Sequence, residues 1–307
     1  MKSVNTLKPK GGKECFFEFM DSIINELHKL EKTRTAETYT SARRSLRKFY
    51  KQKNLPFYKL DAQLIHSYQS HLIQKGLSMN TISFYNRILR ATYNRAVSQN
   101  RTKNRHPFKE VYTGVDKTLK RSVPISCIKK IKHMNFIEGS CEDFARDIFM
   151  FSFYTRGMSF IDIAYLQKKD LKNGILTYRR KKTGQLLFIR WEQCMENIVL
   201  KYYDNESQYL LPILNNDNRD TRKQYIYTAH RVNQALKKIG KRLNLDIPLT
   251  MYVARHSWAS IAQNKNIPLS IISKGMGHDS EETTKIYLNS LDNNRIDNAN
   301  NKIIRSL

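Results

Sequence analysis

The sequence predicts a mainly α-helical protein in which an N-terminal helical bundle precedes an α+β domain with a small β-hairpin sheet. Apolar residues recur at helical spacing through most of the chain, as in the stretch 15–30, where Phe16, Phe19 and Ile23 fall on one face. Two β-rich runs lie within residues 173–190 and flank a Lys-Thr-Gly turn, which is typical of a hairpin. A chain of 307 residues is also long enough for two domains.

The first domain is expected at residues 13–100 as a bundle of four helices. Their expected bounds are 15–30, 35–53, 61–75 and 78–100. Ser78 is a favoured N-cap residue and begins the last helix. The helix surfaces carry many basic side chains, which either lie along phosphates or form an ordinary solvated face. They are Arg43, Arg44, Arg47, Lys48, Arg87, Arg90 and Arg95.

Two basic segments flank this bundle. Residues 1–12 are expected to form a flexible start of the chain. Residues 101–123 are broken by Pro107 and Gly114 and lack a sustained period, which is typical of a linker. Because this linker is itself basic, it can follow a nucleic-acid backbone.

The second domain is expected at residues 124–307 and ends in a polar, asparagine-rich segment, 291–307. Its helices are expected at 126–135, 141–155, 159–168, 191–204, 228–244, 252–264, 268–274 and 281–290. The hairpin follows the third of these helices and has Lys181, Lys182 and Gly184 at its turn.

The charge of the chain indicates a polyanionic partner. Lysine and arginine number 54 against 27 acidic residues, which gives a formal net charge of +27. Self-repulsion at this level disfavours the compact state unless negative charge compensates it. An anionic membrane is the less favoured partner, because no run of about 18 apolar residues occurs. The sequence therefore favours a nucleic acid.

Location and metal content are also constrained by the sequence. The first residues contain no apolar core of a signal peptide, so the expected location is the cytoplasm, at the nucleoid. Cys15, Cys127, Cys141 and Cys194 are scattered and form no CxxC pair, so they are expected to be reduced packing residues. We expect no metal site and no cofactor.

The stretch YVARHSWAS, residues 252–260, raises the question of which chemistry the second domain carries. It places Arg255 among small and apolar residues, where a charge without a partner costs several kcal/mol. Either a carboxylate or an anionic ligand must meet it. The chain has no P-loop, no GxSxG motif and no acidic cluster suited to Mg²⁺. It therefore lacks the residues that the usual nuclease and nucleotide-hydrolase mechanisms require.

A second motif follows about one helix later. In GMGHDSEETTKIY, His278 lies at a turn, Ser280 is an expected N-cap, and Tyr287 lies on the helix that begins there. By itself, a tyrosine on an amphipathic helix is expected to be a packing residue. Together with the stretch around Arg255, however, the motif resembles the tyrosine recombinase (phage integrase) family. That family has an HxxRH block, then Gly-His, and a nucleophilic tyrosine nine positions after that histidine, the spacing from His278 to Tyr287.

The resemblance extends over nearly the whole chain and implies a SAM-like core-binding domain, a basic linker and a catalytic domain of the tyrosine recombinase/type IB topoisomerase fold. Two positions depart from the pattern. Tyr252 replaces the first histidine of HxxRH, and Ser159 stands where the first arginine block has its arginine, with Asp162 aligned to the acidic residue of that block. Arg156 lies three residues earlier and, if this region is helical, its long side chain reaches the same place. The alternative is a structural ion pair of Arg156 with Asp147 or Asp162.

The resemblance implies a role for each site residue. Arg255 binds the phosphate, His256 accepts or relays the tyrosine proton, His278 donates to the phosphate, and Lys182 protonates the departing 5′-oxygen. The last assignment depends mostly on the resemblance, because the neighbouring Arg179, Arg180 and Lys181 are equally basic and are expected to contact phosphates. Tyr252 either donates a hydrogen bond where the family has histidine or only packs. With cations supplied by side chains, no metal is required.

The implied reaction joins a DNA 3′-phosphate to Tyr287 and later rejoins strands without ATP. The implied partner is double-stranded DNA with inverted-repeat core sites, bound by a monomer in solution that forms a homotetramer on two duplexes and exchanges residues 291–307. The short segment before the first helix favours a simple recombinase such as a DNA invertase over an arm-binding integrase, and integration of a mobile element stays open. The alternatives are a type IB topoisomerase-like enzyme and an inactive DNA-binding protein.

Overall fold

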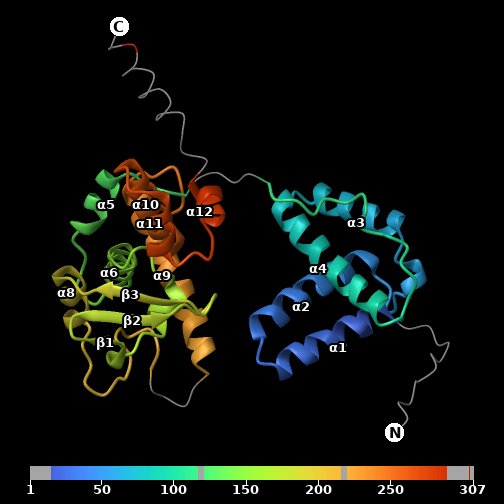
Figure 1. Cartoon of the computed structure of the whole chain (residues 1–307), viewed down its shortest axis with the longest axis horizontal. Coiled ribbons are helices and arrows are strands. Elements are labelled where there is room, and N and C mark those ends of the chain that lie inside the picture. The colour runs from blue at the N-terminus through green and yellow to red at the C-terminus, as the bar shows by residue number, and fades with distance from the viewer. Residues whose placement is uncertain (1–14, 117–120, 216–219, 289–303, 305–307) are drawn as a thin grey trace. The chain divides into compact units, whose positions relative to one another are not determined.

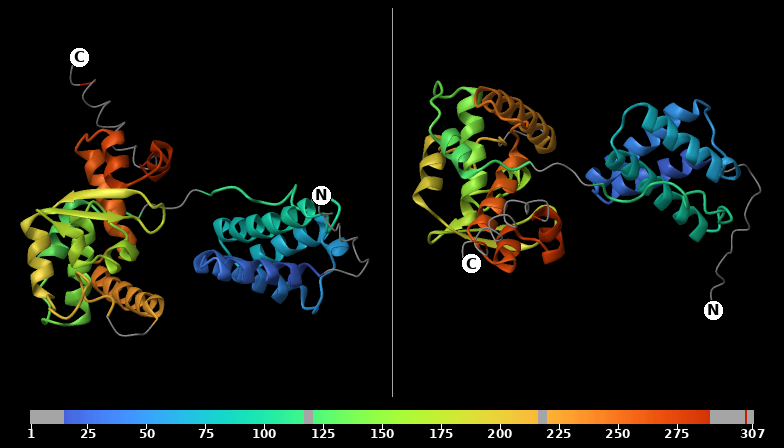
Figure 2. Two further views of the ribbon diagram at one scale, coloured as in Figure 1. Left: turned by 60° about the horizontal axis from the view of Figure 1, so that its bottom comes forward. Right: turned by 90° about the horizontal axis from the view of Figure 1, so that it is seen from above.

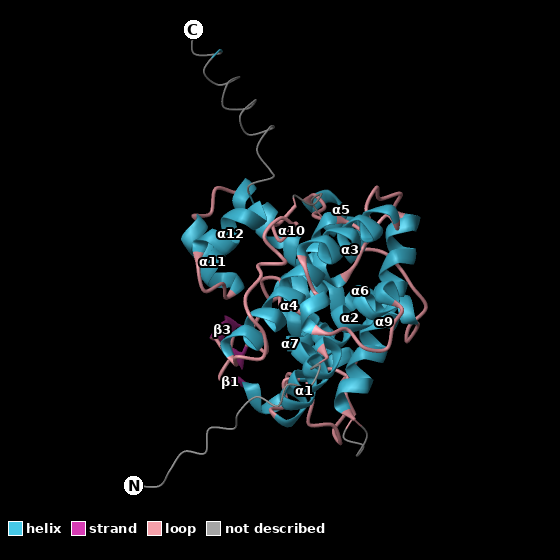
Figure 3. Cartoon of the chain, turned by 90° about the vertical axis from the view of Figure 1, so that its right-hand side faces the viewer, coloured by secondary structure: helices cyan, strands magenta, loops and turns pink. Residues whose placement is uncertain are grey.

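A computed structural model describes residues 15–116, 121–215, 220–288 and 304, with the side chains of 285–288 outside the description. The chain divides into two compact units, Met1–Thr118 and Leu119–Leu307. Helices dominate both units, and the strands of the described residues form one small sheet (Figure 3). The predicted fold class, a helical first domain and a mainly helical second domain with a small sheet, is confirmed.

The first unit is a four-helix bundle. Its elements are α1 Phe16–Lys29, α2 Thr33–Tyr50, the 3₁₀ turn η1 Phe57–Lys59, α3 Ala62–Gln74 and α4 Met79–Ser98. Large side chains from each helix meet in one core, and among them Phe16, Leu46, Tyr68 and Tyr93 are at most 1% exposed. Ser78 accepts a hydrogen bond from the Thr81 amide and so caps α4.

The chain after α4 packs back on the first unit (Figure 2). Phe108 and Val111 are buried in the core of the bundle. Asn86, which is fully buried on α4, donates to the Tyr112 carbonyl at 3.0 Å. Residues 101–116, which composition places in the linker, therefore contribute to the first unit, because their apolar side chains fill a face that α4 leaves open.

The second unit is built around α6 (Figure 1). The helix spans Cys141–Tyr154 and contacts α5, α8, α9 and α10. The helices around it are α5 Ile125–Lys132, α7 Phe160–Ala164, α8 Gln193–Lys201, α9 Thr221–Arg242, α10 Met251–Asn264, α11 Leu269–Met276 and α12 Glu281–Leu288. Because α6 is covered on several sides, its buried residues include Ile148, Phe149 and Phe151.

The sheet follows the 3₁₀ turn η2, Lys168–Asp170, and consists of β1 Leu171–Lys172, β2 Ile175–Arg179 and β3 Leu186–Arg190, all antiparallel. Arg179 pairs with Leu186 at the closed end of the β2–β3 hairpin. Along β2 the side chains alternate, with Leu176 and Tyr178 buried against the core and Ile175 and Arg179 exposed. The strand β2, which leads into the hairpin turn, thus packs one face against the core.

Two helix bounds differ by more than three residues from those expected. The helix α9 begins at Thr221 instead of 228, because the Asp220 side chain accepts from the amides of Arg222 and Lys223 and caps it earlier. The helix α7 ends at Ala164 instead of 168. Beyond it the backbone of Leu166 accepts from the Leu210 amide, so tertiary pairing replaces the last helical turn.

None of the described helices is both long and apolar enough to cross a bilayer.

Candidate active site

The second unit contains a cleft of about 810 Å³ whose wall is strongly basic. The residues come from α7, the hairpin turn, α9, α10 and the turn between α11 and α12. Its charged and aromatic members include Arg180, Lys182, Lys237, Tyr252, Arg255 and His278. Among the described residues that line it, Asp279 is the one carboxylate. The cleft therefore has the charge of an anion-binding site.

Arg255 lies in the wall of this cleft and is only 7% exposed. Its Nη1 donates to the Gly157 carbonyl at 2.7 Å, and its Nη2 donates to the Met276 carbonyl at 2.8 Å. The same Nη2 lies 3.0 Å from His278 Nε2. These contacts join α10 to the α6–α7 turn and to the end of α11, so the guanidinium is held in one orientation by two separate segments.

The close approach at Arg255 depends on Gly157. This residue has φ +75°, and a Cβ placed on it would lie 2.8 Å from Arg255 Cα. A side chain there would therefore meet the backbone of α10. Glycine both adopts the left-handed conformation and leaves the space that Cα, Cβ and Cγ of Arg255 occupy.

The protonation state of His278 follows from its two contacts. Arginine can only donate, so His278 Nε2 accepts from Arg255 and the hydrogen lies on Nδ1. Nδ1 donates to Thr284 Oγ1 at 2.7 Å. Burial, followed by the charges of Arg255, Arg180 and Lys182, lowers the pKa of His278 to about 4. The imidazole is thus neutral at pH 7.

Thr284 connects this histidine to the helix of the expected nucleophile. It is fully buried on α12, three residues before Tyr287. The backbone of Tyr287 is helical, whereas its side chain lies outside the described residues. The contact between His278 and Thr284 therefore fixes the start of α12 against the cleft.

His256 and Tyr252 form a pair one helical turn apart on α10. Their rings lie 4.2 Å apart between centroids and meet edge to face. Burial, with the charges of Arg121 and Arg255, lowers the pKa of His256 to about 4. Tyr252 is 48% exposed and lines the cleft, whereas His256 is not among the described lining residues. The structure thus places Tyr252, at the position of the first histidine, on the cleft side of this pair.

The hairpin turn presents Lys182 to the cleft, and Asp162 braces that turn. Asp162 is 4% exposed, and its Oδ1 accepts from the Lys181 amide at 2.8 Å. Its Oδ2 accepts from Ser159 Oγ at 2.6 Å, and Ser159 is the N-cap of α7. The side chain of Lys181 points elsewhere, since its ammonium lies 4.3 Å from the centre of the Tyr165 ring.

Arg156 does not occupy the place expected for it. The expectation that a helix brings Arg156 to the position of Ser159 is wrong. The helix α6 ends at Tyr154, and Arg156 has φ +62° in the turn that follows. Its Nη1 contacts the Phe188 carbonyl at 3.3 Å, and it is not among the described residues that line the cleft. Neither alternative ion pair forms, since Asp147 binds Arg146 and Lys201 instead.

Arg180, which the sequence groups with Arg179 and Lys181 as an expected phosphate contact, differs from both in its burial. It is only 8% exposed and continues the buried face of β2 after Leu176 and Tyr178. Its Nη1 donates to the Gly277 carbonyl, directly before His278. The period of two along β2 could have revealed this, since an inward Leu176 and Tyr178 place Arg180 inward and Arg179 outward. Arg179 indeed remains at the surface and donates to the Gly184 carbonyl at 3.1 Å.

The basic residues of the first unit divide into paired and exposed groups. Arg43 pairs with Asp21 at 2.5 Å, and Arg95 pairs with Glu26 at 2.5 Å. The guanidinium of Arg47 lies 5.9 Å from the centre of the Phe17 ring, although the residue is exposed. The remaining exposed residues are Arg44, Lys48 and Arg87. Exposed cations are the better candidates for phosphate contacts, since their charge is not already neutralised.

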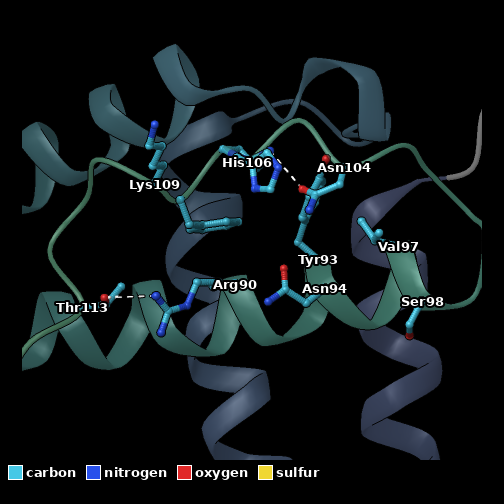
Figure 4. Close-up of a pocket in the computed structure, with 11 residues that line it drawn as sticks. Arg90, Tyr93, Asn94, Val97, Ser98, Asn104, His106, Lys109 and Thr113 are labelled. Carbon is cyan, nitrogen blue, oxygen red and sulfur yellow. Dashed lines mark hydrogen bonds between the residues drawn. The ribbon is translucent and has the colours of Figure 1, made fainter.

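The first unit also has a pocket of about 540 Å³, between α4 and the segment that packs back on it (Figure 4). Arg90 lines this pocket and donates to Thr113 Oγ1 at 3.2 Å. The backbone amide of His106 donates to Asn104 Oδ1 at 3.0 Å. These contacts hold the returning segment in place. Among the described residues that line this pocket, no buried cation contacts an imidazole, whereas Arg255 contacts His278 in the cleft.

Comparison with known proteins agrees with this division of the chain. Residues 15–112 match the phage integrase SAM-like domain, and residues 131–294 match the phage integrase family. The tyrosine recombinase XerA of Pyrococcus furiosus is 26% identical over 220 residues, which are 69% of this chain and 71% of that protein. The XerA of Saccharolobus solfataricus is 23% identical over 138 residues, which are 45% of this chain and 41% of that protein.

Solved structures show the same fold at low sequence identity. A lambda integrase tetramer bound to a Holliday junction has a TM-score of 0.68 and 14% identity, covering 91% of this chain and 78% of that chain. The Tn1549 transposon integrase in complex with transposon right end DNA has a TM-score of 0.67 and 16% identity, covering 95% of this chain and 99% of that chain. Since the phage integrase match includes more than half of the residues, the chain belongs to the phage integrase family of tyrosine recombinases.

Proposed function

We propose that this protein is a site-specific DNA recombinase that cleaves and rejoins strands through a 3′-phosphotyrosyl intermediate at Tyr287. The observation that carries the proposal is the setting of Arg255. Its buried guanidinium is fixed by two carbonyls and by His278 in the wall of a basic cleft. The helix that carries Tyr287 begins three residues after that histidine and contacts it through Thr284.

A basic cleft addresses the first difficulty of the reaction, which is the acidity of the nucleophile. An ordinary phenol has a pKa of about 10, so only about one in 1,000 is ionised at pH 7. Nearby cations favour the phenolate. They also stabilise the charge that accumulates on the non-bridging oxygens when the phosphorus becomes pentacovalent. In this proposal Arg255 serves the second purpose, because its planar fork can bind two phosphate oxygens.

The remaining residues have separate tasks. His278, anchored at Nδ1 to Thr284, accepts from Arg255 in the free protein, and it donates to the phosphate from Nε2 once the bound anion favours the protonated imidazole. Lys182 protonates the departing 5′-oxygen from the hairpin turn, which Asp162 braces. His256 accepts or relays the proton of Tyr287. In the cleavage step the phenolate oxygen bonds to phosphorus, the bond from phosphorus to the 5′-oxygen breaks, and that oxygen receives the proton.

Rejoining follows from the same chemistry. The phosphotyrosyl ester retains the broken linkage, so a 5′-hydroxyl from a second duplex can attack it without ATP. The proposed partner is duplex DNA with inverted-repeat core sites, and the proposed assembly is a homotetramer on two duplexes, since relatives bind core sites as dimers and Holliday junctions as tetramers. The proposed outcome is integration or inversion. Residues 291–307, the proposed exchanged segment, lie outside the described residues except for Ile304.

The proposal is tested by trapping the covalent intermediate. Binding sites are first selected from a random-sequence duplex library, and the selected site is then synthesised with a nick one nucleotide beyond each candidate scissile phosphate. After cleavage the short fragment diffuses away, so a protein–DNA adduct that survives SDS accumulates. We expect the wild-type protein and Tyr252→Phe to form this adduct and Tyr287→Phe to form none.

Other outcomes identify the alternatives. An adduct with Tyr287→Phe contradicts the assignment of the nucleophile. DNA binding without any adduct in the wild-type protein identifies an inactive DNA-binding protein. Relaxation of a supercoiled plasmid by a monomer, with no exchange between two duplexes, identifies a topoisomerase-like activity instead of recombination.

A further inference from the structure

The cleft lacks a second arginine at the position where the resemblance expects one. Ser159 stands there, and its hydroxyl caps α7 and donates to Asp162. Arg156 contacts the Phe188 carbonyl and is not among the described residues that line the cleft. A phosphate with two non-bridging oxygens would therefore meet Arg255 on one side, and the opposite contact must come from elsewhere in the chain.

Arg180 is the other buried guanidinium of this cleft. It is 8% exposed, lines the cleft with Arg255 and continues the inward face of β2. None of the ion pairs among the described residues includes it. Its Nη1 donates to the Gly277 carbonyl, which is a neutral partner, and its Nε is buried without a hydrogen-bond partner. A buried cation with one neutral contact is costly unless an anion completes its shell.

The two guanidinium groups are held by one turn. Arg255 donates to the Met276 carbonyl, Arg180 donates to the Gly277 carbonyl, and His278 follows directly. The charges of both arginines contribute to lowering the pKa of His278, so both lie close to its imidazole. Gly277 permits this packing, because a Cβ there would lie 2.7 Å from Arg180 Cδ. Two buried cations thus face one imidazole from different strands and helices of the unit.

We propose that Arg180 contacts a non-bridging oxygen of the scissile phosphate and supplies the second guanidinium of the site. The proposal rests on the proposed function and adds a residue to it. Arg180 forms and breaks no covalent bond. It neutralises charge that develops on the phosphate oxygens, opposite Arg255, in a place where the chain has no arginine at the aligned position.

A structural role is the competing explanation. Gln185 Oε1 is a buried acceptor without a hydrogen-bond partner, and it also lies near Gly277. A small movement would pair it with Arg180 Nε, and Arg180 would then only hold the hairpin against the turn before His278. The two roles predict different cleavage rates. Loss of an arginine that is only structural should slow cleavage equally, whatever the charge of the phosphate.

The test measures adduct formation on nicked duplexes that carry either a phosphate or a methylphosphonate at the scissile position. A methylphosphonate has one charged oxygen replaced by a methyl group, so it needs less positive charge from the protein. We expect Arg180→Gln to cleave the phosphate about 100-fold more slowly or worse, the loss typical of one missing oxyanion donor. We expect the same variant to approach the wild-type rate on the methylphosphonate.

Three matched variants complete the experiment. Arg190→Gln removes an exposed arginine of the neighbouring strand β3, Arg156→Gln removes the residue that sequence spacing favours, and Gln185→Met removes the structural partner. We expect all three to cleave the phosphate at close to the wild-type rate. The proposal is overturned if Arg180→Gln retains the wild-type rate, if its loss is the same on both substrates, or if Arg156→Gln shows the loss and the rescue instead.

A binding measurement keeps the two proposals separate. Inorganic phosphate is titrated into the free protein while the imidazole signal of His278 is followed by NMR, with His278→Asn as the assignment. If the wild-type protein forms no adduct, the proposed function fails, but weaker phosphate binding in Arg180→Gln than in Arg190→Gln still supports the role of Arg180. Equal binding in the two variants, or no binding to the wild-type protein, overturns it. If Arg180→Gln unfolds below the temperature of the assay, Arg180→Lys, which keeps the charge, takes its place.

Discussion

Arg255 Nη2 and His278 Nε2 lie 3.0 Å apart, and this contact makes the two side chains one unit. The arginine fixes the tautomer of the imidazole. The imidazole also contacts Thr284, so it links α10 to α12. The residues come from two motifs that lie more than 20 positions apart in the sequence. Their contact explains why a buried arginine is tolerated on α10, since its N–H groups meet carbonyl and imidazole acceptors.

Replacing Arg255 should remove most of the cleavage activity. We expect Arg255→Gln to lower the rate of adduct formation by about 100-fold to 1,000-fold, because one fixed donor to the developing oxyanion is lost. Arg255→Lys should recover only part of this, since an ammonium cannot bind two oxygens in a fork. Arg190→Gln, on the exposed face of β3, is the control and should cleave normally. Equal rates for the Gln variant and this control would contradict the assignment of Arg255.

The close packing of Gly157 on α10 predicts a specific defect. Gly157→Ala should lower the free energy of unfolding by about 1–2 kcal/mol for the left-handed backbone and by a further amount of about 1–3 kcal/mol for the contact with Arg255. Gly174→Ala is the matched control, because Gly174 has φ +70° but nothing within 4 Å of the added Cβ. Urea denaturation of both variants measures the difference, and equal destabilisation would mean that the contact relaxes freely.

Stability should depend on pH through the two histidines of the site. Burial and neighbouring cations lower the pKa of His256 and of His278 from 6.5 to about 4 in the folded state. Between these values the unfolded chain binds more protons, so the folded state loses stability as the pH falls from about 6.5 to about 4. His278→Asn should weaken this dependence in urea titrations, whereas His133→Asn, at an exposed position, should leave it unchanged.

Binding of an anion should reverse part of the shift at His278. A phosphate beside Arg255 offsets the positive charge that disfavours imidazolium, so the pKa of His278 should rise when phosphate or DNA is bound. The imidazole signal of His278, followed by NMR across the pH range with and without phosphate, measures this. A pKa that does not move would show that the anion binds elsewhere.

Salt dependence should distinguish the exposed cations of the first unit from the paired ones. Each phosphate contact contributes roughly 0.9 to the slope of log affinity against log salt. Arg44 is exposed on α2, so Arg44→Gln should reduce that slope by about one such contact. Arg95→Gln should change it little, because Arg95 is already paired with Glu26. Fluorescence anisotropy with the selected duplex at several salt concentrations gives both slopes, and the reverse order would place the DNA on another face.

The role of Lys182 can be separated from that of the turn that carries it. Lys182→Met should slow cleavage because the departing 5′-oxygen lacks a proton donor, and Asp162→Ala should slow it less, by releasing the Lys181 amide. A substrate with sulfur in place of the bridging 5′-oxygen needs no proton, since a thiolate is a good leaving group. Both variants should recover on it. Arg190→Gln again serves as the control, and a loss that persists on the sulfur substrate would exclude general acid catalysis by Lys182.

Several features could be predicted from local sequence because they depend on contacts within one element. Helical periodicity located the helices of both units, Ser78 was recognised as an N-cap, and the two β-rich runs located the hairpin. The two bounds that differed most, the end of α7 and the start of α9, are those where a distant backbone or a capping aspartate replaced the expected hydrogen bonding. Periodicity does not detect such contacts, because they add no repeating apolar position.

By itself, the sequence determined the fold class, the basic character of the chain and the pair of motifs that carry Arg255 and His278, because periodicity, charge and spacing are all properties of the linear chain. The tertiary structure alone decided which arginine accompanies Arg255 at the cleft. Arg156 and Arg180 are both basic and lie near the expected position, but a left-handed turn directs the first to the Phe188 carbonyl, and the inward face of β2 buries the second beside His278. That choice depends on the direction of a side chain from a folded backbone, which residue spacing alone does not specify.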